Sequence, residues 1–331
     1  MLTLFEIMVA KTYDEKRDFD MQVEWSSVSK RLSEVGYDGV PASVILFLLA
    51  LVLTPTGDCK RKAILNLDKD EIIDVWDQIV DALEQTVDYF RTVYRIPVSS
   101  LLPYDALLVP FAYWFYCNKS GDSDGAIGAR MREFFWRASL SNRYSSGVET
   151  KLASDKRRVD DIMEGKSAPW SDLGDRDLII DGPQALIETN FATGNSLCKA
   201  ILCLFAHEQP RNFDNDGVVL LDNSHLKIAS SKNYHHFFPK KHLRDAGKEN
   251  ENSVVNITLI GADLNKRKIR AKSPQIYIAS CEKDNKTIQR TLETHLIERD
   301  GMGIDEDDYD LFLNRRAEKI WKLLELRIRA V

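Results

Sequence analysis

The histidine and asparagine side chains best suited to hydrolytic chemistry are concentrated in one part of this 331-residue chain. His235 and His236 are adjacent, and Pro239 follows three residues after the second histidine. Asn256 comes 20 residues after His236, and Asn265 nine residues after that. Neighbouring side chains on a strand point to opposite faces, so the two imidazoles can take different roles if the strand ends at the proline. One could bind a metal ion and the other accept a proton, as a hydrolytic metal site requires.

The elements that must position these side chains read as strand, loop, strand and helix. Extended segments are expected near residues 217–221, 232–238 and 254–260, because β-branched and aromatic residues alternate with turn formers there. A helix is expected near residues 262–272, ending before Pro274, which disfavours helical geometry in the residue before it. The sequence therefore places the histidines and asparagines on a short β-rich core within residues 231–274.

The first half of the chain has a different, helical pattern of apolar residues. From Asp20 to about Arg158 apolar residues recur at helical spacing, most clearly over residues 70–90, where five of them share one face. Turn formers and charges dominate residues 165–182, where we place a boundary. We predict an α+β protein with a helical region over residues 1–185 and a second domain over residues 186–331. Helices are predicted at 43–53, 70–90, 105–116, 127–140, 152–163, 196–206 and 307–329.

Composition narrows the class of protein. The chain is 44% hydrophobic and 29% charged with five scattered cysteines and no Cys-x-x-Cys pair, which favours a globular protein in a reducing cytoplasm over a disulfide framework or a four-cysteine zinc site. The longest apolar run, residues 40–53, is shorter than the ~20 residues that cross a bilayer, and the first residues do not resemble a secretory signal. We therefore expect no membrane partner.

Charge is distributed unevenly. The whole chain has a net charge of −6, which excludes nucleic-acid binding by bulk charge. Residues 227–272 alone carry 11 lysines and arginines against four acidic residues, a local charge of +7. A basic segment on an acidic protein favours salt-sensitive, sequence-independent contact with a phosphate backbone.

His-His-x-x-Pro, Asn256 and Asn265-x-x-Lys268, in this order and spacing, resemble the His-Asn-His (HNH) endonucleases. The resemblance implies a ββα-metal nuclease domain with flanking helices, following a mostly helical N-terminal region. It implies that His236 is the general base, that Asn256 ties the loop and orients His236, and that His235 and Asn265 hold a divalent metal. The phosphate contacts implied are Lys240, Lys266, Arg267 and Lys268.

The identity of residue 235 indicates which metal ion the site would prefer. Related nucleases often have an acidic residue immediately before the base, and this chain has His235. Imidazole suits Mn²⁺ or Ni²⁺ better than Mg²⁺, which prefers oxygen ligands. We expect Mg²⁺, Mn²⁺ or Ni²⁺ as the cofactor, with a preference for the transition metals.

Three further segments are similar to one subgroup, the C-terminal nuclease half of the GmrSD-type, modification-dependent (type IV) restriction proteins. Residues 2–7 look like the end of its ParB-like nucleotidase domain, residues 135–145 resemble its helical middle, and residues 312–320 are similar to its arginine-rich closing helix. The resemblance implies cleavage of foreign or modified phage DNA. It also implies an upstream nucleotidase domain or subunit, whose catalytic segment would precede Met1.

Two alternatives to a DNA endonuclease stay open. The chain could be a catalytically inactive nucleic-acid-binding or partner-docking module of a defence complex, in which His235 has abolished useful metal binding. It could be a ribonuclease, because a site that binds the phosphate does not itself distinguish ribose from deoxyribose. The oligomeric state also stays open. A single site of this kind cuts one strand at a time, so a homodimer would supply the two sites that a double-strand break requires.

Overall fold

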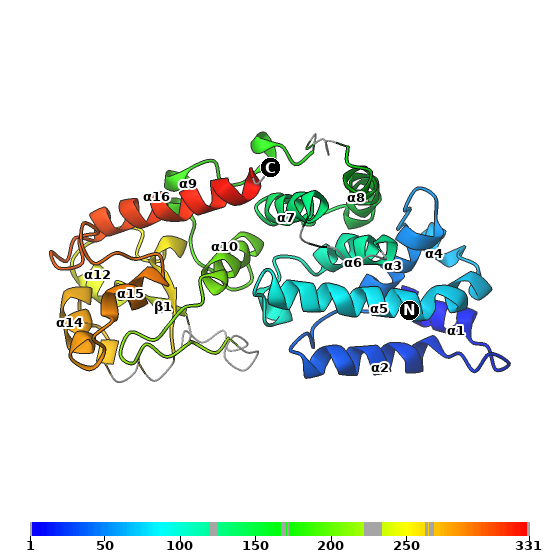
Figure 1. The fold of residues 1–331 in the computed structure, drawn as a ribbon, viewed down its shortest axis with the longest axis horizontal. Coiled ribbons are helices and arrows are strands. Elements are labelled where there is room, and N and C mark those ends of the chain that lie inside the picture. The colour runs from blue at the N-terminus through cyan, green and yellow to red at the C-terminus, as the bar shows by residue number, and fades with distance from the viewer. Residues whose placement is uncertain are drawn as a thin grey trace. The chain divides into compact units, whose positions relative to one another are not determined.

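The chain forms two compact units in the computed structural model (Figure 1). The structure describes residues 2–118, 123, 125–166, 170, 172–221, 234–261, 264 and 268–329. Unit 1 comprises Met1–Asp177 with Ile328–Val331, and unit 2 comprises Leu178–Arg327. The boundary thus falls within the turn-rich, charged segment 165–182.

Unit 1 is built from helices. Several begin at a side chain that accepts hydrogen bonds from the first turn, as Asp68 does from the amides of Asp70 and Glu71 (2.8 and 3.1 Å). The α-helices are α1 (Leu4–Thr12), α2 (Met21–Glu34), α3 (Ser43–Leu53), α4 (Arg61–Leu65), α5 (Lys69–Thr92), α6 (Leu108–Cys117), α7 (Ala126–Ser139) and α8 (Val148–Met163). Short 3₁₀ turns are η1 (Ser99–Leu101), η2 (Asp105–Leu107) and η3 (Asp175–Asp177).

The core of unit 1 is aromatic. Helix α6 is apolar on almost every face and packs against α5 and α3 (Figure 1). The Phe90 and Phe111 rings meet edge to face at 4.9 Å, and Tyr94 stacks on Phe135 at 4.0 Å. Such contacts stabilise a core beyond the area that they bury. The aromatic residues of α6 and α7 therefore serve packing.

Unit 2 combines helices with a small antiparallel ribbon. Strands β1 (Tyr234–His236) and β2 (Ile257–Leu259) pair so that His235 lies opposite Thr258 and His236 opposite Ile257. The other elements are α9 (Pro183–Glu188), α10 (Ser196–His207), α12 (Lys240–Asp245), η4 (Val254–Asn256), α14 (Pro274–Asp284), α15 (Ile288–Glu293) and α16 (Tyr309–Ile328).

The predicted fold class, an α+β protein with a ββα-metal nuclease domain, is wrong. Helices make up most of the described chain, and its sheet has two strands of three residues each, which is not the arrangement of a ββα-metal domain. The expected strand at 217–221 contributes one isolated bridge, between Arg211 and Val218. Of the helix expected at 262–272, only Leu264 and residues 268–272 lie within the described part of the chain.

Local interactions explain why the strands are shorter than the sequence predicts. Pro239 has no amide to donate to a ladder, so the ribbon cannot continue far beyond β1. Val254 and Val255 favour a strand by type, yet the Ser253 hydroxyl accepts from the Val255 amide (3.2 Å) and the chain turns into η4. Pro274 occupies the first turn of α14, where a missing amide costs nothing.

Among the described residues, none of the helices combines the length with the apolar composition that crossing a bilayer requires.

Candidate functional site

The β1–β2 ribbon places His235 inside unit 2. The side chain is 4% exposed, and the ring lies 6.2 Å from that of Tyr277 and nearly perpendicular to it. The Thr258 hydroxyl donates to the His235 carbonyl oxygen (3.2 Å), and the Tyr277 hydroxyl donates to the Phe237 carbonyl oxygen (2.7 Å). Backbone and side-chain bonds therefore fix this end of the ribbon.

One nitrogen of His235 stands out. Its Nδ1 atom is buried and has no hydrogen-bond partner among the described residues. Burial lowers the pKa of His235 to about 3, with smaller effects from His236 and His295, so the ring is neutral near pH 7. An unsatisfied buried polar atom is costly, and a neutral imidazole nitrogen is a good ligand for a transition metal. His235 thus has the chemistry expected of a metal ligand.

His236 ends β1 and is held by a loop residue, Asn252. Its Nε2 atom lies 3.1 Å from the Asn252 amide oxygen, which only accepts, so Nε2 carries the hydrogen and Nδ1 keeps a lone pair. Burial lowers the pKa of His236 to about 4, the bond to Asn252 raises it in part, and the charge of Lys240 lowers it further. The imidazole is therefore neutral near pH 7 and oriented to accept a proton at Nδ1.

Asn252 is itself anchored by the segment that follows α9. Its side-chain amide donates to the Phe191 carbonyl oxygen (3.0 Å), and the Phe191 amide donates to the Asn252 carbonyl oxygen (2.8 Å). The residue was not predicted from the sequence, where it is one of several polar residues in a loop. The signal that could have found it is its place four residues before Asn256.

Asn256 is fully buried and joins two turns of the chain. Its amide oxygen accepts from the Phe238 amide (2.9 Å), and its amide nitrogen donates to the carbonyl oxygens of Phe238 (2.9 Å) and Glu251 (3.2 Å). Its own carbonyl oxygen accepts from the Phe237 amide (2.8 Å). These bonds fasten the loop between the strands to the residues that follow His236.

The predicted phosphate contacts are placed unequally. Lys240 begins α12, close enough to His236 to lower its pKa. Lys268 is engaged elsewhere, with Nζ 2.5 Å from a carboxylate oxygen of Asp284 and 4.0 Å from one of Asp214. Asn265, Lys266 and Arg267 lie outside the described residues.

The described residues supply part of a metal site. Over the ranges described, no three or more histidine, cysteine, aspartate or glutamate side chains are grouped as metal ligands. Of the two predicted ligands, the structure describes His235, whose partnerless nitrogen fits the role.

A buried arginine on α16, Arg316, supports the ribbon from within unit 2. It donates to the backbone carbonyl oxygens of Val255, Ile257 (2.8 Å) and His295 (2.9 and 3.2 Å), and its guanidinium lies 5.0 Å from the centre of the Phe205 ring. Burial lowers the pKa of Arg316 to about 9. Sequence reasoning missed this role, because arginine on an amphipathic helix is usually exposed.

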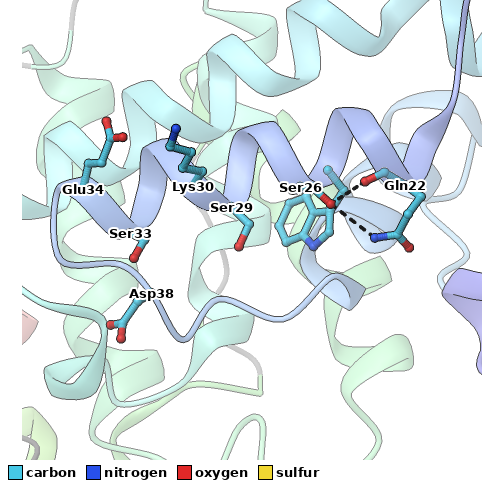
Figure 2. Close-up of a pocket in the computed structure, with 8 residues that line it drawn as sticks. Gln22, Ser26, Ser29, Lys30, Ser33, Glu34 and Asp38 are labelled. Carbon is cyan, nitrogen blue, oxygen red and sulfur yellow. Dashed lines mark hydrogen bonds between the residues drawn. The ribbon is translucent and has the colours of Figure 1, made fainter.

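Two grooves lie away from the histidines. One, of about 660 Å³, runs along α2, where Gln22 and Ser26 are hydrogen bonded to each other (Figure 2). It is lined by Gln22, Trp25, Ser26, Ser29, Lys30, Ser33, Glu34 and Asp38. The other, of about 790 Å³, is lined by Glu208 after α10 and by residues of α15, α16 and the loop between them, which include side chains of both charges. Neither is lined by His235 or His236.

Comparison with known proteins adds one distant relative. No known family profile matches the chain. An uncharacterized protein of the archaeon Methanocaldococcus jannaschii, MJ0686, is 24% identical over 293 residues, an alignment that covers 84% of this chain. The alignment covers 47% of the archaeal protein, so the chain is similar to about half the length of that relative.

Proposed function

We propose that the chain is a metal-dependent phosphodiester hydrolase that nicks or cuts DNA, with its site at the end of β1. The observation that carries the proposal is the pair of adjacent, neutral imidazoles, one with a buried partnerless nitrogen and the other oriented by Asn252. The proposal rests on these side chains and on the order of the motif, and it does not require a ββα-metal fold.

In this proposal the two histidines divide the work. His236 accepts a proton from the attacking water at Nδ1, while its Nε2–H bond to Asn252 holds the ring in place. His235 and, by the resemblance, Asn265 would hold a divalent ion, which when bound would neutralise charge that grows on the phosphate and the leaving oxygen. Asn256 keeps the loop closed around the turn after His236.

DNA is the proposed substrate because the site lies within a basic segment of the sequence. Lys240 lies beside His236, and residues 227–272 carry a net charge of +7. Such a segment binds phosphate backbones through sequence-independent contacts that weaken as salt rises. By its resemblance to the modification-dependent restriction proteins, the target would be foreign or modified DNA in the cytoplasm, a setting that fits five free cysteines.

The test is a supercoiled-plasmid assay of the parent chain and His236→Ala, with EDTA, Mg²⁺, Mn²⁺ and Ni²⁺ in parallel. Metal-dependent nicking should fall about 10²–10⁴-fold in His236→Ala, the usual contribution of a general base. His207→Gln is the matched control, because His207 lies at the end of α10 and is not part of the site. It should nick like the parent.

The same assay separates the alternatives. Equal inertness of parent and variant, with salt-sensitive DNA binding intact in a gel-shift assay, would replace the enzyme with a nucleic-acid-binding module. A parallel digest of matched RNA identifies a ribonuclease if the RNA alone is cut.

A further inference from the structure

A buried cluster of charge in unit 1 has no part in the proposed hydrolysis. Asp155 on α8 is fully buried and accepts two hydrogen bonds from Arg143, one from Nε at 3.0 Å and one from Nη2 at 2.5 Å. It also accepts from Arg158 and from the Tyr144 hydroxyl (2.7 Å). Asp155 thus orients two arginines that are themselves no more than 5% exposed.

A second carboxylate closes the cluster on its solvent side. Asp172 bridges the two guanidinium groups, with one oxygen 2.9 Å from Arg143 Nη1 and the other bonded to Arg158 Nη2. Its side chain is 33% exposed, so it reaches the arginines from the surface.

The charges around Asp172 are not balanced. Arg143, Arg158 and Lys151 all stabilise the ionised form of Asp172 and hold its pKa below the usual range. The buried carboxylate Asp155 interacts with the same two arginines. Three cations face two carboxylates. In addition, Arg158 Nε is buried without a hydrogen-bond partner among the described residues. The site therefore keeps one positive charge and one donor that Asp172 does not use.

The segment that carries Asp172 is held independently of it. Arg137 on α7 donates to the Leu173 carbonyl oxygen and to Asp175, both at 3.1 Å, and the Leu173 side chain is buried. The Asp172 side chain can therefore rotate away while the backbone beside it stays docked.

We propose that Arg143 and Arg158 form a binding site for a phosphate monoester dianion, which Asp172 occupies when no ligand is bound. A dianion in place of Asp172 would balance the charge of the three cations and Asp155. Two guanidinium groups held by a buried carboxylate present several N–H donors in fixed planes, the geometry in which arginine binds phosphate oxygens. This site lies in unit 1, and its proposal does not depend on the proposed nuclease activity.

The experiment uses the full chain carrying His236→Ala, in EDTA, so that no cleavage interferes. Inorganic phosphate is titrated calorimetrically into this protein, Asp172→Asn and Asp175→Asn at constant ionic strength, near pH 8, where a phosphate is mainly a dianion. Asp172→Asn removes the competing carboxylate and should bind phosphate at least about tenfold more tightly than its parent. Asp175→Asn, the matched control on the same segment, should not.

Thermal unfolding keeps the test valid if Asp172→Asn is less stable. Phosphate at the same ionic strength should restore the melting temperature of Asp172→Asn, and adding Arg158→Gln should abolish both the tight binding and the restoration. A destabilised Asp172→Asn that phosphate neither binds nor stabilises would show that the carboxylate is structural only and would overturn the proposal. If phosphate binds, a nucleoside 5′-monophosphate and a 5′-phosphorylated oligonucleotide, each against its unphosphorylated form, identify the source of the group.

Discussion

Arg316 Nη1 lies 2.8 Å from the carbonyl oxygen of Ile257, the residue that pairs with His236 across the ribbon. The same nitrogen also donates to the Val255 carbonyl oxygen, on the other side of Asn256. A single guanidinium therefore holds the backbone on both sides of the asparagine that fastens the loop. Its remaining donors bind the His295 carbonyl oxygen.

Replacing Arg316 by methionine should destabilise unit 2 by about 3–5 kcal/mol, because three buried carbonyl groups lose their donors. Arg315→Met is the control, since Arg315 is more than half exposed and should change stability by no more than ~0.5 kcal/mol. Urea unfolding monitored by circular dichroism measures both. Equal effects of the two substitutions would contradict the assigned role of Arg316.

Asn252 should act as a positioning residue. We expect Asn252→Ala to lower the nicking rate about 10–100-fold, the usual effect of losing a partner that orients a site histidine, with plasmid affinity unchanged. Asn252→Asp keeps an oxygen that accepts from His236 Nε2 and should recover part of the rate. If alanine and aspartate reduce the rate equally, the bond to His236 does not matter for turnover.

His235 should determine metal binding. We expect the parent to bind Mn²⁺ or Ni²⁺ more tightly than Mg²⁺, and His235→Ala to lose most of its affinity for the transition metals. Calorimetric titration of each ion reports this without any need for activity. Strong nicking in Mg²⁺ with none in Mn²⁺ would exclude the imidazole as a ligand.

Stability should fall in acid because of His295. Burial lowers the pKa of His295 to about 3, against a small rise from its bond to the Arg211 carbonyl oxygen (2.7 Å) and a small lowering from Arg316. Between about pH 6.5 and 3 the unfolded chain binds a proton that the folded protein excludes, so stability is complete above this range and is lost as the pH falls. At about pH 5 the loss from this residue is about 2 kcal/mol.

The measurement is a pair of urea titrations, near pH 7 and near pH 5, on the parent and on His295→Gln. Glutamine can still donate to the Arg211 carbonyl oxygen but does not titrate. The variant should therefore lose about 2 kcal/mol less than the parent between the two conditions. An unchanged difference would mean that His295 does not contribute to acid unfolding.

The helices were the most predictable part of the fold. Residues 43–53 and 70–90 were expected as helices and are found in α3 and α5, because long apolar periodicity survives almost any packing. The strands were overestimated, since β-branched residues such as Val254 and Val255 favour extension wherever they occur and are overruled by turn chemistry. Helix α14, which Pro274 opens, was not predicted, because proline can open a helix as well as exclude one.

The candidate site was predictable only where residue type and order carry the signal. Adjacency pointed to His235 and His236, and spacing pointed to Asn256. The contact of Asn252 with His236 spans 16 residues, and those of Arg316 with the ribbon span about 60. No periodicity encodes such contacts, because they depend on how the loop and α16 pack.

The two-way bond of Asn256 to Phe238 has a consequence for local unfolding. The asparagine amide joins positions 18 residues apart and so closes a ring of chain that contains α12. Closing such a ring restricts the loop, as a covalent crosslink would. The entropic cost of closure grows only slowly with the number of residues in the loop. The residues between Phe238 and Asn256 should therefore open together, and the Phe238 amide should exchange its hydrogen only when the whole ring opens.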